Sequence, residues 1–239
     1  MNSLNILSGG AAQGLVASLT PAFKGHTGFD IAGEFGAVGV MADKLRRGTP
    51  ADLIILTAAL VAKLAEEKLV VTTSMADVGL VETALAVRTS DPLVAVRDAA
   101  DLREALLASD AIYVPDTKTS TAGIHVANVL DRLGIADEIA SRLRIFPNGA
   151  TAMRELAASE AQRPIGCTQS TEIISTKGVT LSGSLPPGCE LATMYTAGIT
   201  VAAAHPQQAQ NLIDLLTGAG QQKQRQRAGF IGGRSQTPK

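Results

Sequence analysis

Four short segments of small or polar residues each stand between an apolar run and a segment with helical periodicity. They are Ser8-Gly9-Gly10-Ala11, Gly36-Ala37-Val38-Gly39, Asp116–Gly123 and Pro147-Asn148-Gly149-Ala150. The first turn of a helix presents unpaired backbone N–H groups and the positive end of the helix dipole. Small residues let a ligand approach that backbone. Several such loops together would form a binding site for a small anion.

The predicted ligand-binding residues of these loops are Ser8, Gly9, Gly10, Ala11, Gly36, Ala37, Val38, Gly39, Lys118, Thr119, Ser120, Thr121, Ala122, Asn148, Gly149 and Ala150. Each position also has a purely structural explanation. Glycine permits a tight turn, hydroxyl side chains cap helices, and asparagine is common in turns. Capping and ligand contact use the same helix end, so the two explanations are compatible.

Three residues are candidates for proton transfer. Lys118 stands among hydroxyl residues, where a cation binds carboxylate or, once desolvated, moves a proton. Glu34 precedes the second loop, and His125 lies in the first turn of the helix expected after the third. The alternatives are a solvated loop lysine, a solvent-facing glutamate on a strand, and a surface or packing histidine.

Strand and helix patterns alternate along the chain. The expected strands are Leu4–Leu7, Phe29–Phe35, Asp52–Leu56, Thr83–Arg88, Ala111–Val114, Leu143–Phe146, Ile165–Thr168 and Met194–Val201. The expected helices are Ala12–His26, Val38–Arg47, Ala58–Glu67, Leu102–Ala108, Gly123–Leu133, Ala136–Leu143, Ala150–Ser159, Ser170–Ile174 and Gln207–Leu216. This alternation predicts an α/β protein with parallel sheets covered by helices. Gly218–Lys239 contains basic residues and no acid, and is expected to be a solvated helix turn and a frayed tail.

The composition of the chain makes several classes of partner unexpected. The 239 residues suffice for one large or two small domains, and 46% of them are apolar. Aromatic residues make up only 3%, with no Trp, and the net charge is −1, so nucleic acid is not an expected partner. No apolar run reaches the ~20 residues of a membrane span. Neither nucleotide-binding glycine motif nor metal-ligand spacing is present, so no cofactor and no metal are expected.

The N-terminal segment and the two cysteines bear on the compartment of the protein. The segment before the first expected strand has no basic region followed by an apolar one, so no signal peptide is visible. We therefore expect a cytoplasmic protein, or a periplasmic one from which a leader was removed. Cys167 and Cys189 are interpreted as buried free thiols, with a single disulfide as the alternative.

Three segments resemble molybdate-binding proteins, the solute-binding components of ABC transporters. They are Gly48–Leu56, Pro115-Asp116 with Ala122-Gly123-Ile124, and Ile165–Glu172. The resemblance runs from about Leu4 to Phe230. It implies a two-lobed type II periplasmic-binding-protein fold, each lobe a mostly parallel sheet flanked by helices. Lobe 1 would be 1–80 plus 194–239 and lobe 2 would be 81–193, with two crossover strands, a ligand cleft between the lobes and hinge closure.

The departures from that family pattern concern the ligand. Members typically have a serine hydroxyl in each first-lobe loop and a tyrosine near the hinge, where this chain has Ala11, Val38 and Gln169. Each lost hydrogen bond costs a tetrahedral oxyanion about 0.5–1.5 kcal/mol. Gln169, by its place in the pattern, is a further predicted ligand contact. Lys118 and the amides of Asn148 and Gln169 suit a carboxylate ligand.

Some relatives of the molybdate binders are enzymes, and this chain resembles the aconitate isomerases among them. The resemblance implies interconversion of the cis and trans forms of an unsaturated tricarboxylic acid by an allylic proton shift. Such a reaction requires a general base and donors that stabilise dienolate charge. The alternative is a non-catalytic solute-binding protein for a carboxylate or for an oxyanion such as molybdate, with a transporter as its partner.

Overall fold

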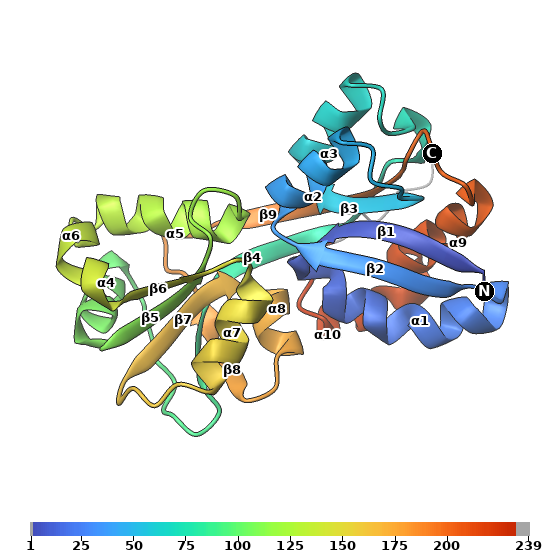
Figure 1. Cartoon of the computed structure of the whole chain (residues 1–239). Helices are drawn as coiled ribbons and strands as arrows, with labels where there is room; N and C mark the ends of the chain where they lie inside the picture. The colour runs from blue at the N-terminus through green and yellow to red at the C-terminus, as the bar shows by residue number, and fades with distance from the viewer. Residues whose placement is uncertain (1, 233–239) are drawn as a thin grey trace. The chain divides into compact units, whose positions relative to one another are not determined.

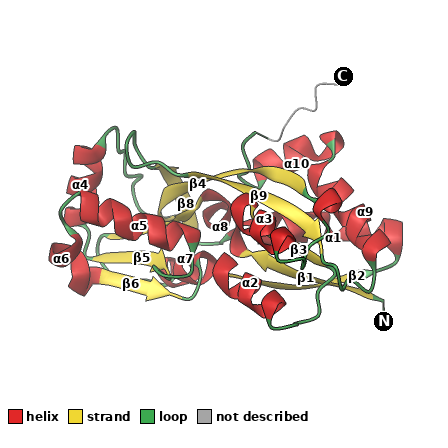
Figure 2. Cartoon of the chain, turned by 90° about the horizontal axis from the view of Figure 1, so that it is seen from above, coloured by secondary structure: helices red, strands yellow, loops and turns green. Residues whose placement is uncertain are grey.

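The computed structural model describes residues 2–232, and its contacts divide the chain into two compact units. Unit 1 comprises Met1–Val81 and Thr193–Lys239, so far as these are described, and unit 2 comprises Glu82–Ala192. The lobes expected from the sequence divide the chain one residue away from each of these boundaries. Each unit is an α/β layer structure (Figures 1 and 2), as the alternating patterns predicted.

Unit 1 is built on a sheet in the order β2-β1-β3-β9, beside which β4 begins. Its strands are β1 (Ser3–Gly9), β2 (Asp30–Gly36), β3 (Leu53–Thr57) and β9 (Ala192–Ile199). Strand β1 is parallel to β2 and to β3, whereas β9 is antiparallel to β3. Its helices are η1 (Gly10–Ala12), α1 (Gln13–Thr27), α2 (Val38–Arg46), α3 (Ala58–Glu66), η2 (Thr72–Ser74), α9 (Pro206–Thr217), η4 (Ala219–Gln221) and α10 (Gln222–Arg227).

Helices cover both faces of this sheet. Figure 1 shows α1 and α9 on one face and α2 and α3 on the other. Because both faces are covered, the first four residues of β3 are all buried, as in other parallel sheets. Phe23 of α1, Ile54 of β3 and Leu212 of α9 belong to the same apolar core. Burial of this core holds the loops after β1, β2 and β3 at one edge of the sheet.

Unit 2 is built on a sheet in the order β4-β7-β5-β6, with β8 paired to β4. Its strands are β4 (Ala76–Arg88), β5 (Ala111–Pro115), β6 (Leu143–Phe146), β7 (Pro164–Gln169) and β8 (Val179–Ser184). Strand β5 is parallel to β6 and β7, while β4 is antiparallel to β7 and β8. Its helices are α4 (Ala99–Ala108), α5 (Thr121–Arg132), α6 (Ala136–Ile139), η3 (Ala140–Arg142), α7 (Gly149–Ala157) and α8 (Ser170–Ser175).

The side-chain alternation of β4 divides the core of unit 2 into two layers. Leu85 packs in a cluster with residues of α4 and α5, including Leu102. Its neighbours Ala84 and Ala86 pack on the opposite face with Met153 of α7 and Ile173 of α8. The small residues on this second face leave room for α7 and α8.

The two units repeat one arrangement of strands. In unit 1 the first strand, β1, lies between β2 and β3, and in unit 2 β5 lies between β6 and β7. In both, a helix follows each of the three parallel strands at its carboxyl end. Ligands of open α/β sheets bind at this edge, where the strand order reverses. Each unit therefore presents one candidate edge.

The structure differs from the expectations at three places, which are the start of β4, strand β8 and the segment after Gly218. Strand β4 begins at Ala76 rather than Thr83, and β8 was not predicted. The segment after Gly218 is not simply solvated, because Arg225 of α10 is 8% exposed and donates to the carbonyls of Leu216 and Gly218. Phe230 is buried as well. The rest of the expected tail, 233–239, lies outside the described residues.

Candidate anion-binding site

The first predicted loop connects β1 to α1 in unit 1 and is buried. Ser8 is fully buried, and its hydroxyl donates to the carbonyl of Gly9 at 2.9 Å. Gly10, Ala11 and Ala12 follow as a buried 3-10 turn without a side-chain cap. The hydroxyl of Ser8 thus has an internal acceptor, while the helix start offers the N–H groups that a helix leaves unpaired.

A close approach of neighbouring residues explains the glycine at position 9. A Cβ atom there would lie 2.8 Å from Cγ1 of Val38 and 3.0 Å from the ring of Tyr195. The second predicted loop, which contains Val38, therefore packs directly against the first. These two loops, predicted separately, meet at the carboxyl edge of unit 1.

In the second loop, Gly36 ends β2 and Ala37 is the extended N-cap of α2. Val38 and Gly39 form the first turn, and Ala37 provides no side-chain cap. A third loop at this edge was not predicted as a site; there Thr57 ends β3 and is the N-cap of α3, again without a side-chain cap. Its signal was a threonine between an apolar strand and a helical pattern.

Asp116 organises the third predicted loop, between β5 and α5 of unit 2. Its Oδ1 accepts the backbone N–H of Lys118 at 2.9 Å, and the N–H and hydroxyl of Thr119 at 2.7 and 2.8 Å. These bonds, the one from the Lys118 N–H first, lower the pKa of Asp116 below its ordinary value. Lys118 itself is exposed, and within residues 2–232 its ammonium group donates no hydrogen bond. The loop thus holds its backbone rigidly and leaves a cation accessible.

Helix α5 begins immediately against this loop. Ser120 is its buried N-cap, with no side-chain cap bond, and Thr121 and Ala122 form the first turn. Gly123 is required because a Cβ would lie 2.1 Å from the carbonyl oxygen of Asp116 and 2.5 Å from that of Pro115. The absence of a side chain at this position therefore allows the start of α5 to pack against the end of β5.

The fourth predicted loop already carries an anion of the chain itself. Asn148 Oδ1 accepts the N–H of Thr151 at 2.8 Å and caps α7. The backbone N–H groups of Gly149 and Ala150 donate to the carboxylate of Glu172. This glutamate lies in the first turn of α8. The groups that the sequence predicted to hold a ligand at this loop therefore have an internal partner.

Glu172 is 5% exposed and accepts two further hydrogen bonds, from the Thr168 hydroxyl at 2.6 Å and from the backbone N–H of Gln169. Burial raises its pKa above the ordinary value, and these donors act in the opposite direction. A Cβ on Gly149 would lie 1.9 Å from Glu172 Oε2. The carboxyl group thus ties α7, α8 and the end of β7 together.

Gln169, the last residue of β7 and the N-cap of α8, is 3% exposed. Neither its amide nitrogen nor its amide oxygen has a hydrogen-bond partner among the described residues. Thr83 lies opposite it on β4, and the hydroxyls of Thr83 and Thr171 are also buried without a partner there. Of these three residues, only Gln169 was predicted from the sequence as a ligand contact.

Two of the proton-transfer candidates have internal partners. Glu34, with its side chain 46% exposed, forms an ion pair with Lys44. Nε2 of His125 lies 2.8 Å from the carbonyl oxygen of Cys189. For both residues, a role in proton transfer stays a prediction from the sequence.

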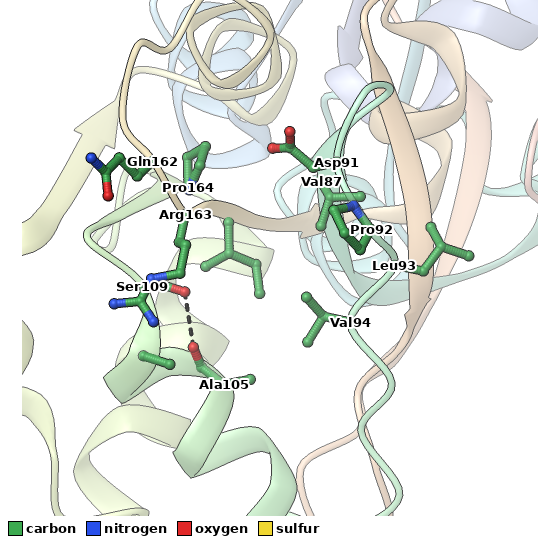
Figure 3. A pocket seen from close by; sticks show the side chains of 12 residues that line it. Val87, Asp91, Pro92, Leu93, Val94, Ala105, Ser109, Gln162, Arg163 and Pro164 are labelled. Atoms are coloured by element: carbon green, nitrogen blue, oxygen red, sulfur yellow. Dashed lines mark hydrogen bonds between the residues drawn. The ribbon is translucent and has the colours of Figure 1, made fainter.

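A separate cavity of about 290 Å³ lies in unit 2 (Figure 3). Its walls come mainly from apolar residues such as Val87, Val94 and Ile165, with Asp91 and Arg163 as the charged members. Ile165 stands at the start of β7, so the cavity lies at the amino end of this strand. The predicted site residues of unit 2 follow the opposite, carboxyl ends.

Three further features concern metal ligands, membrane-spanning helices and the two cysteines. No cluster of His, Cys, Asp or Glu within residues 2–232 has the grouping to hold a metal ion. No described helix is both long and apolar enough to cross a membrane. Cys167 and Cys189 are both buried and free, and burial raises the pKa of Cys167 to about 12.

The chain belongs to a family of bacterial extracellular solute-binding proteins, whose sequence model matches residues 4–231. This family description supports an exported protein and gives no support to the cytoplasmic alternative. The chain is also 24% identical over 227 residues to an aconitate isomerase from Pseudomonas sp., a match that covers 90% of this chain and 82% of that protein.

Solved structures support the same fold. The periplasmic molybdate-binding protein of Azotobacter vinelandii superposes with a TM-score of 0.81 at 17% identity, covering 97% of this chain and 100% of that one. A sulfate-binding protein from Mycobacterium tuberculosis gives a TM-score of 0.73 at 18% identity, covering 96% and 86%. The predicted resemblance to molybdate-binding proteins is confirmed at the level of fold and family.

Proposed function

We propose that this protein binds a small polycarboxylate at its carboxyl-edge loops and isomerises it by an allylic proton shift of the aconitate type. The observation that carries the proposal is the similarity to an aconitate isomerase along 90% of the chain. The exposed ammonium of Lys118 beside the start of α5 supports an anionic ligand.

Binding would rest on backbone donors together with one cation. The starts of η1 and α2 lack side-chain caps, as does that of α5. Carboxylates are stabilised at such helix starts by the N–H groups and the dipole. The loop before α7 would contribute less to binding, because Glu172 already accepts its N–H groups.

The reaction moves one proton and leaves the atom count unchanged. A base removes a proton from the carbon next to the double bond, and the electron pair delocalises into the adjacent carboxylate as a dienolate. The same or another group then returns a proton to the other end of the allyl system. Lys118, Glu34 and His125 are the proposed proton carriers, and donors near the developing charge would lower the barrier.

Proton NMR in D2O tests the proposal. The purified protein is incubated with trans-aconitate, and both cis product and deuterium in the substrate are followed. We expect product and exchange, with turnover reduced at least tenfold in Lys118→Ala and unchanged in Lys177→Ala, an exposed lysine of the same unit. Absence of both product and exchange at high protein concentration would exclude the isomerase.

A non-catalytic solute-binding protein is the second candidate, favoured by the family match over residues 4–231. It would deliver a carboxylate or an oxyanion to an ABC transporter. Binding of trans-aconitate measured by calorimetry, without deuterium exchange, would establish this candidate in place of the first.

A further inference from the structure

Three buried polar residues of unit 2 belong to the carboxyl end of β7, to the strand position opposite it and to the helix start that follows it. Thr83 and Gln169 are directly opposed on the antiparallel strands β4 and β7. Directly opposed residues of such a pair have Cβ atoms about 5 Å apart and point to the same face. Thr171 follows in the first turn of α8. Each is at least 97% buried. Thr83 and Gln169 are cross-strand neighbours and Thr171 is two residues beyond Gln169, and we refer to the three as the Thr83–Gln169–Thr171 cluster.

The hydrogen-bonding capacity of this cluster is unused. The amide oxygen and nitrogen of Gln169 and the hydroxyls of Thr83 and Thr171 have no partner among the described residues. Buried polar groups in folded proteins are nearly always paired, because leaving one unpaired costs free energy. Glu172, by contrast, takes its donors from Thr168 and from backbone N–H groups, including that of Gln169. The backbone N–H of Gln169 therefore has a hydrogen-bond partner, whereas its side-chain amide has none among the described residues.

The chemistry of the unused groups restricts what can satisfy them. The Gln169 amide offers two N–H donors and one carbonyl acceptor, and each threonine hydroxyl both donates and accepts. A fully ionised oxyanion only accepts hydrogen bonds, so it would leave the amide oxygen of Gln169 unpaired. A hydroxyl, a carboxamide or a carboxyl in its acid form both donates and accepts, and so can pair with both ends of the amide.

We infer that the Thr83–Gln169–Thr171 cluster is a subsite for an uncharged ligand group that both donates and accepts hydrogen bonds. The inference rests on the proposed carboxylate binding and deepens it. A hydroxylated acid would place its hydroxyl there, whereas an unsaturated tricarboxylic acid would place one carboxyl in the acid form. Discrimination arises because the wrong ligand leaves buried amide groups unpaired.

Calorimetry with three related ligands tests the subsite. Propane-1,2,3-tricarboxylate carries only carboxylates, citrate adds a hydroxyl, and the monoamide of propane-1,2,3-tricarboxylate adds a permanently uncharged donor and acceptor. We expect citrate or the monoamide to bind the native protein at least tenfold more tightly than propane-1,2,3-tricarboxylate. A preference for citrate identifies a hydroxyl, and a preference for the monoamide identifies an acid-form carboxyl.

The variant Gln169→Met keeps the side-chain length and removes both amide groups. We expect the tenfold preference to fall below threefold in this variant, while its melting temperature without ligand rises, because an unpaired buried amide has been removed. Gln162→Met, at an exposed glutamine of unit 2, serves as the control and should retain the preference. If Gln169→Met does not fold, Thr83→Val carries the same comparison.

The outcomes separate this inference from the proposed function. If the native protein binds no tricarboxylate at all, the proposed function fails. If it binds all three ligands equally, or if Gln169→Met and Thr83→Val retain the preference, the proposed function stands and the subsite is overturned.

Discussion

The carboxylate of Glu172 does within the chain what an anionic ligand does at other helix starts. It accepts the N–H groups of Gly149 and Ala150 at the start of α7, the hydroxyl of Thr168 and the N–H of Gln169. Anions are stabilised at this end of a helix by the dipole and the unpaired donors. The loop before α7 has the sequence pattern of a ligand site, but its N–H groups bind the side chain of Glu172 and so connect α7 to α8.

The close approach at position 149 predicts a strong requirement for glycine. In Gly149→Ala the new Cβ would lie 1.9 Å from Glu172 Oε2 and 2.1 Å from the Thr168 hydroxyl, so the buried bonds must shift. We expect a loss of about 1–3 kcal/mol in the free energy of unfolding, measured by urea denaturation. Gly183→Ala in β8, where a Cβ meets nothing within 4 Å, is the matched control. Equal stability of the two variants would refute the close packing.

Burial of Glu172 predicts a pH dependence of stability. Because the folded-state pKa is raised above the ordinary value of 4.5, the folded chain retains this proton where the unfolded chain has lost it. The contribution to stability is therefore fully present below pH 4.5 and is lost as the pH rises through the raised pKa.

Denaturation of the native protein and of Glu172→Gln over a range of pH measures this contribution. The native protein's stability relative to the variant should decrease as the pH rises, since glutamine does not titrate. Glu155→Gln, at an exposed position on α7, is the matched control. If the stability difference between the native protein and Glu172→Gln is constant over this pH range, or changes in the opposite direction, the pKa of Glu172 is not raised.

At the scale of elements, the loops after parallel strands differ in what fills them. The β1 loop is packed by Val38 and Tyr195, the β6 loop by Glu172, and the β5 loop by its own Asp116. Only the last leaves a lysine exposed at the start of a helix. Loops with the same sequence pattern thus differ in whether their donor groups are already paired within the chain.

Removing the Asp116 carboxylate should loosen the β5–α5 loop. Asp116→Ala removes the acceptor of the Lys118 and Thr119 N–H groups, so we expect a loss of about 0.5–2 kcal/mol in stability at neutral pH. Because the pKa of Asp116 is lowered, this difference should shrink as the pH falls through that pKa. Thermal and urea denaturation of Asp116→Ala beside Asp131→Ala, an exposed change on α5, provide the measurement. A difference that grows in acid would contradict the assignment.

Local patterns predicted most elements, because strand and helix periods are local. Helix α2 was expected at Val38–Arg47 and is observed at Val38–Arg46, where the positive φ of Gly48 follows. Strand β8 was missed because only its first residue is buried and no alternation marks it. Pairings across the chain could not be predicted locally: Thr83 meets Gln169 only through the register of β4 on β7.

At the scale of the molecule, the two units repeat one strand arrangement that the sequence does not reveal. Strands β1 and β5 each lie between two parallel neighbours, and the loops after them occupy equivalent edges. Unit 1 is completed by β9 and α9 from the far end of the chain, whereas unit 2 is continuous. The fold follows from this architecture, while ligand choice depends on the few side chains at each edge.

Isothermal calorimetry at one pH and ionic strength compares the binding of trans-aconitate with that of molybdate and of sulfate. We expect trans-aconitate to bind at least tenfold more tightly than either oxyanion, and we expect Lys118→Ala to lose most of this preference while Lys177→Ala keeps it. Tight binding of molybdate or sulfate without measurable binding of trans-aconitate would show that the protein is not a polycarboxylate-binding protein.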